Sequence, residues 1–363
     1  MIKGHGGNVE LLAARLGCAV NEIADMSSNL NPLGPPAGFE RFAAEHLRSL
    51  ERLPEADAST LVKTFCRKRN VAPETTIAAN GTTWFIYTLP LALASEKVLI
   101  SGPTYSDYAD GCKSLGISPC FLTAKQEDDF RPDLSRLSRM AVDFDTVFLC
   151  NPNNPTGNLL SRKEVIGVVS HHPATVFVID ESYLPFVPDA EKESLVSRTD
   201  CKNLIVLSSM SKIFTVPGMR IGFLTAHPDI VEKVMRFYQP WSVNALAQKA
   251  AAYLLETHSD DSPFLVRTRE FIRTERALFM QKLENMPGVR PFPSTTSFVL
   301  ARVTCGLTAE ELCRRIGRNR ILIRNCSNFQ GLGDEQLVSF YLKVRRLNLR
   351  LSNILRGEMN HED

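Results

Sequence analysis

Short apolar runs recur along the first two thirds of the chain, and each one ends in a group of polar turn residues. Four runs are nearly all apolar, namely KVLIS, TVFLC, TVFVI and LIVLS at residues 97–101, 146–150, 175–179 and 204–208. Continuous apolar runs of this length are typical of strands in a parallel sheet that is covered on both faces. The loops that follow them are GPTY, NPNNPTG, DESY and SMSK. Open α/β sheets bind ligands beyond the carboxyl ends of their strands, so we expect the chemistry of this protein in these loops.

The pattern changes after about residue 240. The segment 242–257 is rich in alanine and predicts a helix. A longer helix is expected within 263–286, where Phe271 with Leu278, and Ile272 with Phe279, repeat at about two helical turns and predict a buried stripe. Strands are expected at 297–303, 321–326 and 337–344, around a helix at 308–317. The sequence therefore predicts a large α/β domain followed by a smaller α+β domain.

Composition and charge narrow the class of protein. The 363 residues include 42 Lys and Arg against 40 Asp and Glu, a formal net charge of +2, with no dense basic tract. Nucleic acid or an anionic membrane surface is therefore not expected as the main partner. Apolar runs such as residues 87–94 are far shorter than the ~20 residues that span a bilayer. The first residues hold no apolar signal core, so we do not expect secretion.

Cysteine usage points to the redox environment. The nine cysteines are odd in number and form no Cys-x-x-Cys pair. Such a distribution fits reduced thiols rather than a disulfide framework. We therefore expect a cytoplasmic protein.

Two of the strand-end loops carry groups that suit a buried cation. NPNNPTG is a stiff turn that limits the conformations of Asn154, although Asn-Pro alone also occurs in ordinary turns. Asp180 directly follows an apolar strand, where a carboxylate is costly to bury without a partner. It is either a helix N-cap or the counter-ion of a buried positive charge. Tyr183, three residues further on, can present its phenol to the same place.

Lys212 follows another strand, in the segment SSMSKIFTVPGMRIGF. Ser209 and Ser211 supply hydroxyl groups and Arg220 supplies a permanent charge, which together resemble an anion cradle beside an amine. A buried lysine with a lowered pKa is a good nucleophile for Schiff-base formation. Read alone, a Ser-Lys pair is more often an ordinary surface feature than a catalytic one.

Two further segments supply a feature that can bind phosphate and an aromatic ring. Residues 79–87, ANGTTWFIY, place a glycine and two threonines before an apolar helical run, which predicts a helix start that can bind phosphate. Tyr105 follows a strand and can stack on a ring. Pyridoxal 5′-phosphate requires an amine for its imine, an acid for its ring nitrogen and a phosphate site. The order of these features, each at a strand end, favours a site for this cofactor.

The motifs NPNNPTG, DESY, SMSK and PGMRIGF resemble those of fold-type I pyridoxal-phosphate enzymes of the aminotransferase superfamily, over nearly the whole chain. The resemblance implies a mainly parallel seven-stranded sheet, a smaller C-terminal domain and a homodimer. It implies an N-terminal arm at 1–30, a large cofactor-binding domain at 31–240 and a small domain at 241–363.

The same resemblance implies roles for individual residues. Lys212 would form the imine, Asp180 would pair with the pyridine nitrogen, and Tyr183 would take part in catalysis. Asn154 and Tyr183 would bond the 3′-oxygen, and Tyr105 would stack on the ring. The residues that it implies for cofactor binding are Gly81, Thr82, Thr83, Tyr105, Asn154, Asp180, Tyr183, Ser209, Ser211, Lys212 and Arg220.

Two branches of the superfamily compete for the activity. HGGN, NLNPLGPP, PWSVNALAQ and IRNCSNFQGL resemble the L-threonine-O-3-phosphate decarboxylases of cobalamin biosynthesis. That branch implies a lyase that converts L-threonine O-3-phosphate to (R)-1-aminopropan-2-yl phosphate, or L-serine phosphate to ethanolamine phosphate, for the aminoalcohol linker of cobamides. It implies substrate contacts for His5, Gly6, Asn31, Asn154 and Arg324. The alternatives are an aminotransferase of the histidinol-phosphate type and, for the HGGN segment, a disordered terminus.

Three positions depart from the family pattern. Ser339 stands where an arginine usually binds the substrate carboxylate, so we expect Arg324 to take that role. Leu53 stands where a tyrosine usually reaches the partner's cofactor phosphate, and TTSF at 295–298 replaces a common Ala-Asn-Phe. Ser339 and Leu53 also keep open a third hypothesis, a regulator or binding protein that retains the fold without catalysis. The presence of Lys212 and Asp180 counts against it.

Overall fold

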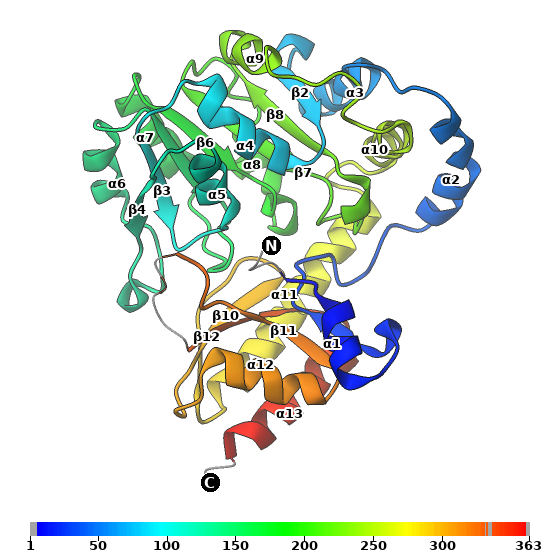
Figure 1. Cartoon of the computed structure of the whole chain (residues 1–363), viewed down its shortest axis with the longest axis vertical. Helices are drawn as coiled ribbons and strands as arrows, with labels where there is room; N and C mark the ends of the chain where they lie inside the picture. The colour runs from blue at the N-terminus through cyan, green and yellow to red at the C-terminus, as the bar shows by residue number, and fades with distance from the viewer. Residues whose placement is uncertain (1–5, 331, 333–335, 361–363) are drawn as a thin grey trace.

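Two β-sheets organise the chain. The computed structural model describes residues 6–330, 332 and 336–360. Its larger sheet has seven strands in the order β2-β8-β7-β6-β5-β3-β4 (Figure 1). Pairing is parallel from β4 through β7, and β8 runs antiparallel to both of its neighbours. The bounds are β2 Thr76–Ala79, β3 Val98–Gly102, β4 Cys120–Thr123, β5 Thr146–Cys150, β6 Val176–Asp180, β7 Leu204–Ser209 and β8 Gly222–Ala226.

The four predicted apolar strands are confirmed as β3, β5, β6 and β7, and every residue of β3 and β5 is buried. The prediction of a mainly parallel seven-stranded sheet is confirmed as well. The patterns did not predict β2, β4 and β8. β4 lies at the edge of the sheet and starts at the exposed Cys120, so it lacks the continuous apolar run of a buried strand.

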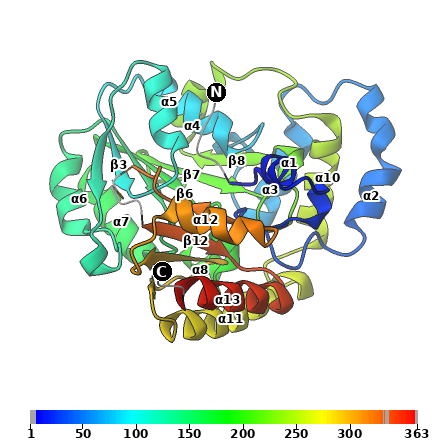
Figure 2. The same cartoon turned by 60° about the horizontal axis from the view of Figure 1, so that its bottom comes forward.

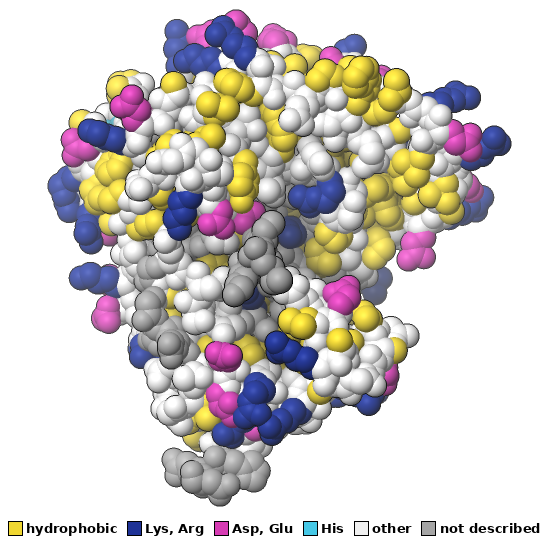
Figure 3. All heavy atoms as spheres, viewed as in Figure 1, with side chains coloured by type: hydrophobic (Ala, Val, Ile, Leu, Met, Phe, Trp, Pro, Cys, Tyr) yellow, Lys and Arg dark blue, Asp and Glu magenta, His cyan; other side chains and the backbone are white. Residues whose placement is uncertain are grey.

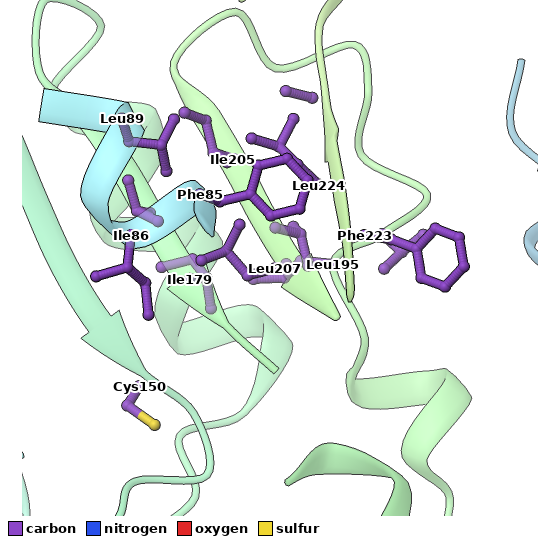
Figure 4. Close-up of a cluster of buried hydrophobic side chains, with 14 of the residues drawn as sticks. Phe85, Ile86, Leu89, Cys150, Ile179, Leu195, Ile205, Leu207, Phe223 and Leu224 are labelled. Atoms are coloured by element: carbon purple, nitrogen blue, oxygen red, sulfur yellow. The ribbon is translucent and has the colours of Figure 1, made fainter. Parts of the chain in front are cut away.

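Helices cover both faces of the seven-stranded sheet. Phe85, Ile86 and Leu89 of α4 point onto the strands, where they meet side chains such as Ile205 and Leu207 (Figure 4). This burial of continuous apolar surface holds the sheet and its helices together. The helices in the first 240 residues are α1 Val9–Leu16, α2 Phe39–Glu45, α3 Ser59–Arg69, α4 Thr82–Ala92, α5 Asp107–Ser114, α6 Leu134–Ala141, α7 Arg162–His171, α8 Ala190–Glu193 and α9 Pro228–Met235.

Short 3₁₀ turns link several of these elements. They are η1 Val20–Glu22, η2 Leu47–Glu51, η3 Pro73–Thr75, η4 Gln126–Asp128, η5 Leu184–Phe186 and η6 Pro217–Met219.

The second sheet has five strands in the order β1-β11-β12-β10-β9. Its bounds are β1 Ala24–Met26, β9 Val289–Pro291, β10 Phe298–Val303, β11 Ile321–Asn325 and β12 Leu337–Tyr341. The helices after residue 240 are α10 Ala245–Thr257, α11 Pro263–Glu284, α12 Ala309–Arg318 and α13 Arg345–Asn360. α11 runs from the upper part of the molecule to the lower one in Figure 1 and lies beside α13 in Figure 2. The predicted helices and strands of the C-terminal third are thus present.

Three details differ from the sequence predictions. β1 falls within the predicted arm at 1–30 but pairs parallel with β11, so this segment is an integral strand of the small sheet. α10 packs on α3 and α2, and its buried side chains join the core of the large sheet, although the predicted boundary at residue 240 assigns it to the small domain. Of the two residue pairs predicted to form a buried stripe on α11, Ile272 and Phe279 are both buried, whereas Leu278 of the other pair is 39% exposed.

Three further observations concern the cysteines, membrane-spanning helices and groups that could bind a metal ion. All nine cysteines lie in the described part of the chain and none forms a disulfide. Among the described residues no helix is long and apolar enough to cross a membrane. Within the same ranges, no group of three or more His, Cys, Asp or Glu side chains is arranged to hold a metal ion.

Candidate active site

The carboxyl ends of β5, β6 and β7 border a cavity of ≈ 220 Å³. Arg324 of β11 and Tyr341 of β12 close it from the small sheet. The parallel strands end at one edge, so loops far apart in the sequence meet there, as the strand pattern predicts. Of the residues predicted for the site, those that line the cavity are Gly6, Gly81, Thr82, Thr83, Tyr105, Asn154, Asp180, Tyr183, Ser209, Ser211, Lys212, Arg220 and Arg324.

Asp180 lies buried at the end of β6, and both of its carboxylate oxygens accept hydrogen bonds. The Tyr108 hydroxyl donates to Oδ2 at 2.8 Å, and the backbone N–H of Ser182 donates to Oδ1 at 2.9 Å. Burial raises the pKa of Asp180, while the bonds from Ser182 and Tyr108 and the charge of Lys212 oppose the rise. The arrangement holds a carboxylate in an apolar wall, where it can pair with a cationic ring nitrogen.

Lys212 faces the same cavity from the loop after β7. The pKa of Lys212 is lowered to about 8, chiefly by burial and then by the nearby positive charge of Arg220, while Asp180 and Asp107 act in the opposite direction. Removing an ammonium group from water disfavours its charged form, which is the dominant cause here. A substantial neutral fraction of the amine near neutral pH makes Lys212 a suitable nucleophile for an aldehyde.

One end of the cavity forms an anion cradle. Gly81 precedes α4 with φ +77°, and a Cβ on it would lie 2.6 Å from Nη2 of Arg220. A Cβ on Gly222 would lie 2.5 Å from the backbone nitrogen of Thr82. Only glycine at these positions therefore lets the guanidinium and strand β8 approach the helix start so closely. No side chain in the described residues caps this end of α4, and its N–H groups with Arg220 suit a phosphate.

The opposite wall carries amides and phenols. Asn154 Nδ2 donates to the Tyr183 hydroxyl at 3.3 Å, and Asn29 Nδ2 donates to the same oxygen. The Tyr341 hydroxyl donates to Asn154 Oδ1 at 3.4 Å. Burial is the main cause that raises the pKa of Tyr183 and Tyr341, so both phenols stay protonated. These groups can bond a ring oxygen.

Asn31 does not line the cavity, which corrects its prediction as a substrate residue. Its Nδ2 donates to the carbonyl of Ile213 at 2.8 Å and to Thr268 Oγ1 at 3.0 Å, and its Oδ1 accepts from the backbone of Leu33. Its backbone N–H also donates to the carbonyl of Lys212 at 3.0 Å. Asn31 therefore braces the lysine loop from behind, and Asn29 is the asparagine of this segment that faces the cavity.

Two of the predicted substrate residues, Gly6 and Arg324, line the cavity beside the small sheet. Gly6 lies so close to Ser27 that a Cβ on it would be 2.2 Å from the Ser27 carbonyl oxygen, which keeps this position open only to glycine. His5 lies outside the described residues. Arg324 donates to Asn328 Oδ1 at 2.9 Å and lies 5.0 Å from the ring centre of Phe329. Arg324 is paired directly opposite Ser339 across β11 and β12, so their side chains share one face of the sheet.

Several cavity residues were not predicted from the sequence. Tyr108, Asn29 and Tyr341 make the hydrogen bonds described above, and Cys150 and Ser27 also line the cavity. Tyr108 ends GPTYSDY, Asn29 begins NLNPLGPP and Cys150 directly precedes NPNNPTG, so these three lie in or beside segments that the sequence analysis singled out. Leu53, where a tyrosine was expected, is 77% exposed and does not line the cavity. No local pattern marks Tyr341, which lies in an ordinary apolar strand.

The donor set fits pyridoxal 5′-phosphate. An amine, a buried acid and an anion cradle that glycine keeps open lie around one cavity of suitable size. Lys212, Asp180 and the start of α4 with Arg220 would hold its aldehyde carbon, ring nitrogen and phosphate. Tyr105 lies in the cavity wall with its ring edge-on to Tyr108, at 5.9 Å between centres.

Known proteins similar to this chain were found by sequence and by structure. The family profile described as aminotransferase class I and II matches residues 21–335. Threonine-phosphate decarboxylase of Salmonella typhimurium is 32% identical over 357 residues, which cover 97% of this chain and 96% of the relative. The crystal structure of L-threonine-O-3-phosphate decarboxylase from Porphyromonas gingivalis is similar with a TM-score of 0.82 and 31% identity, over 93% of this chain and 99% of that one. The histidinol-phosphate aminotransferase from Clostridium acetobutylicum has a TM-score of 0.85 and 28% identity, over 93% and 99%.

Proposed function

The chain belongs to the class I and II aminotransferase family, and from this premise we propose that it is a pyridoxal-phosphate-dependent decarboxylase of an O-phospho amino acid. Its substrate would be L-threonine O-3-phosphate or L-serine phosphate, and its product the aminoalcohol phosphate used for the cobamide linker. The similarity to two threonine-phosphate decarboxylases over nearly the whole chain supports this proposal.

Each cavity residue has a defined task in this reaction. Bound pyridoxal phosphate supplies an electron-accepting ring for the bond that breaks at the substrate's α-carbon. With the cofactor bound, Asp180 would keep a proton on the ring nitrogen, and the start of α4 with Arg220 would bind the phosphate. Tyr105 would lie against the ring, while Asn154 and Tyr183 would donate to its 3′-oxygen. Lys212 Nζ would deliver a proton to the α-carbon in the place of the lost carboxylate.

The relation between Ser339 and Arg324 is the observation that carries the choice of substrate. The family's carboxylate arginine is absent at 339, and a guanidinium stands directly opposite on β11. A carboxylate without an arginine on the last strand is less stabilised as an anion, which favours its loss as CO2. Arg324 borders the cavity one strand away, where it can bind an anionic group of the substrate.

A substrate panel tests the proposal. The protein, saturated with pyridoxal phosphate, is incubated separately with L-threonine O-3-phosphate, L-serine phosphate and histidinol phosphate plus 2-oxoglutarate. We expect one CO2 for each aminoalcohol phosphate formed, as one proton replaces the carboxylate. Lys212→Ala should lose this activity by about 10³-fold or more, because it lacks the amine. Mass spectrometry of the products and trapping of CO2 provide the measurement.

A histidinol-phosphate-type aminotransferase is the second candidate, and the structural similarity to the Clostridium acetobutylicum enzyme favours it. It would give glutamate and a carbonyl product from histidinol phosphate, with no CO2. That outcome would replace the decarboxylase proposal. A wild-type protein that takes up no pyridoxal phosphate at all would leave only a non-catalytic binding role.

We also propose a homodimer. Leu47, Leu50 and Leu53 are 53%, 56% and 77% exposed around η2, and Trp241 is 53% exposed. Hydrophobic side chains gather on the surface over α2 and α10 (Figure 3). Several large apolar side chains so exposed in one region are typical of a protein–protein contact.

A further inference from the structure

Tyr341 brings an unpredicted phenol into the cavity. It lies on β12, is 3% exposed, and is paired directly opposite Phe298 of β10 with ring centres 5.3 Å apart. Ser339, two residues earlier, points to the same face of the strand because side chains alternate. Tyr341 therefore lines the cavity from the small sheet, whereas Ser339, where the family pattern expects an arginine, is fully buried and does not line it.

The Tyr341 hydroxyl determines how the amide of Asn154 is oriented. Burial raises the pKa of Tyr341, so the phenol keeps its proton and acts as a donor. It donates to Asn154 Oδ1 at 3.4 Å, a long hydrogen bond inside a buried wall. An amide oxygen only accepts and an amide nitrogen only donates, so a donor on one side selects one of the two amide orientations. The Asn154 NH2 group is thereby turned toward Tyr183.

The orientation of the Asn154 amide affects the direction in which the Tyr183 hydroxyl donates its proton. Its hydroxyl oxygen accepts from both Asn29 Nδ2 and Asn154 Nδ2. A hydroxyl group has one proton and two acceptor lone pairs, so two incoming bonds leave its proton to point elsewhere. Burial is the largest cause that raises the pKa of Tyr183, so this proton is retained. Tyr183 lines the cavity and can therefore donate into it.

From this network we infer that Tyr341 is a positioning residue for the cofactor's 3′-oxygen. It acts through Asn154: the phenol fixes the amide so that Asn154 and Tyr183 both present donors to that oxygen. The inference rests on the proposed use of pyridoxal phosphate and assigns a role to a residue outside the family motifs. Without the Tyr341 hydroxyl, the Asn154 amide can turn its oxygen toward the anionic ring oxygen, which is repulsive.

The inference predicts an optical change. Donors to the 3′-oxygen stabilise its negative charge and compete with the proton on the neighbouring nitrogen of the lysine linkage. They therefore lower the pH at which this nitrogen loses its proton, an event visible in the cofactor's absorption spectrum. In Tyr341→Phe, which keeps the ring against Phe298, we expect the midpoint to rise by about 0.3 to 1 pH unit, the equivalent of one weakened hydrogen bond.

The experiment titrates the visible absorption of the cofactor-loaded protein between pH 5 and 10. Tyr238→Phe is the matched control, because Tyr238 donates to the carbonyl of Ala78 at 3.1 Å and does not line the cavity. Its midpoint should equal that of the wild type. In an Asn154→Ala background, Tyr341→Phe should produce no further shift, since the effect passes through the amide.

The outcomes separate the two proposals. A visible band in the wild type with an unchanged midpoint in Tyr341→Phe overturns the positioning role and leaves the cofactor proposal intact. A shift that persists in full in the Asn154→Ala background also overturns it, because Tyr341 would then act directly. The absence of a band in the wild type under saturating pyridoxal phosphate overturns the proposed function itself.

Discussion

Burial sets the charge states of the groups that face the cavity, and it acts in opposite directions on acids and amines. It raises the pKa of Asp180 and lowers that of Lys212 to about 8. Their mutual attraction opposes both shifts but does not cancel them, because burial is the largest cause in each group and Arg220 adds a like charge beside the lysine. The amine is consequently far more available near neutral pH than a solvated lysine.

The pH dependence of cofactor uptake tests this. A lysine reacts with an aldehyde only as the neutral amine, and that form dominates above the pKa of Lys212. The rate at which cofactor-free protein takes up pyridoxal phosphate should therefore rise about tenfold per pH unit below pH 8 and level off above it. Stopped-flow absorbance gives the rate. A rise that continues to the ordinary lysine value of 10.5 would contradict the lowered pKa, and Lys113→Ala on the exposed side of α5 should leave the profile unchanged.

At the scale of elements, one asparagine ties three segments together. Asn31 precedes α2 in a loop, contacts the lysine loop at Lys212 and Ile213, and reaches Thr268 in α11. Thr215 Oγ1 donates to the Asn31 carbonyl at 3.2 Å. The loop that carries Lys212 is thus held in place by the loop before α2 and by α11, the helix that runs from one sheet to the other.

Removing this brace should affect both stability and chemistry. Asn31→Ala breaks two buried side-chain donations, so we expect the free energy of unfolding to fall by about 1–3 kcal/mol and decarboxylation to slow. Urea unfolding gives the first value and CO2 release the second. Asn353→Ala, at an exposed site on α13, should change stability by no more than about 0.5 kcal/mol. Equal stability of Asn31→Ala and wild type would contradict the brace.

At the scale of the whole molecule, one contact between the parts that carry the two sheets is a separate cluster of apolar side chains. Phe130 near the large sheet packs with Phe292 and Leu300 near the small one. Gly157, the last residue of NPNNPTG, accepts hydrogen bonds from the backbone and side chain of Thr295. The loop that positions Asn154 is therefore held by the segment that leads into β10.

Gly157 is the tightest point of this contact. It has φ +72°, and a Cβ on it would lie 2.1 Å from Ser294 Oγ. Gly157→Ala should therefore lower the free energy of unfolding by about 1–3 kcal/mol, and Ser294→Gly in the same chain should recover part of the loss. Gly167→Ala is the control, because it lies in α7 with nothing within 4 Å and should raise stability by about 0.5–1 kcal/mol. Thermal unfolding of the wild type, the two single variants, the double variant and the control provides the comparison, and additive effects of the two changes would argue against the contact.

The sequence by itself determined which strand ends carry chemistry. Lys212, Asp180 and Asn154 each follow an apolar run, and parallel strands must bring their carboxyl ends to one edge. Apolar periodicity, which reports burial locally, also predicted four strands of the large sheet and most elements after residue 240, while the number of seven strands came from the family resemblance.

Only the tertiary structure shows which residues form the wall of the cavity on the side of the small sheet. β1 joins the small sheet through residues nearly 300 positions away, as its pairing of Ala24 with Ile321 shows. Asn29 and Asn31 are two positions apart in the same loop, and packing alone turns one into the cavity and the other onto α11. Tyr341 meets Asn154 across 187 positions of the chain. Such contacts depend on how two sheets pack against each other, and no local pattern of apolar and polar residues encodes that geometry.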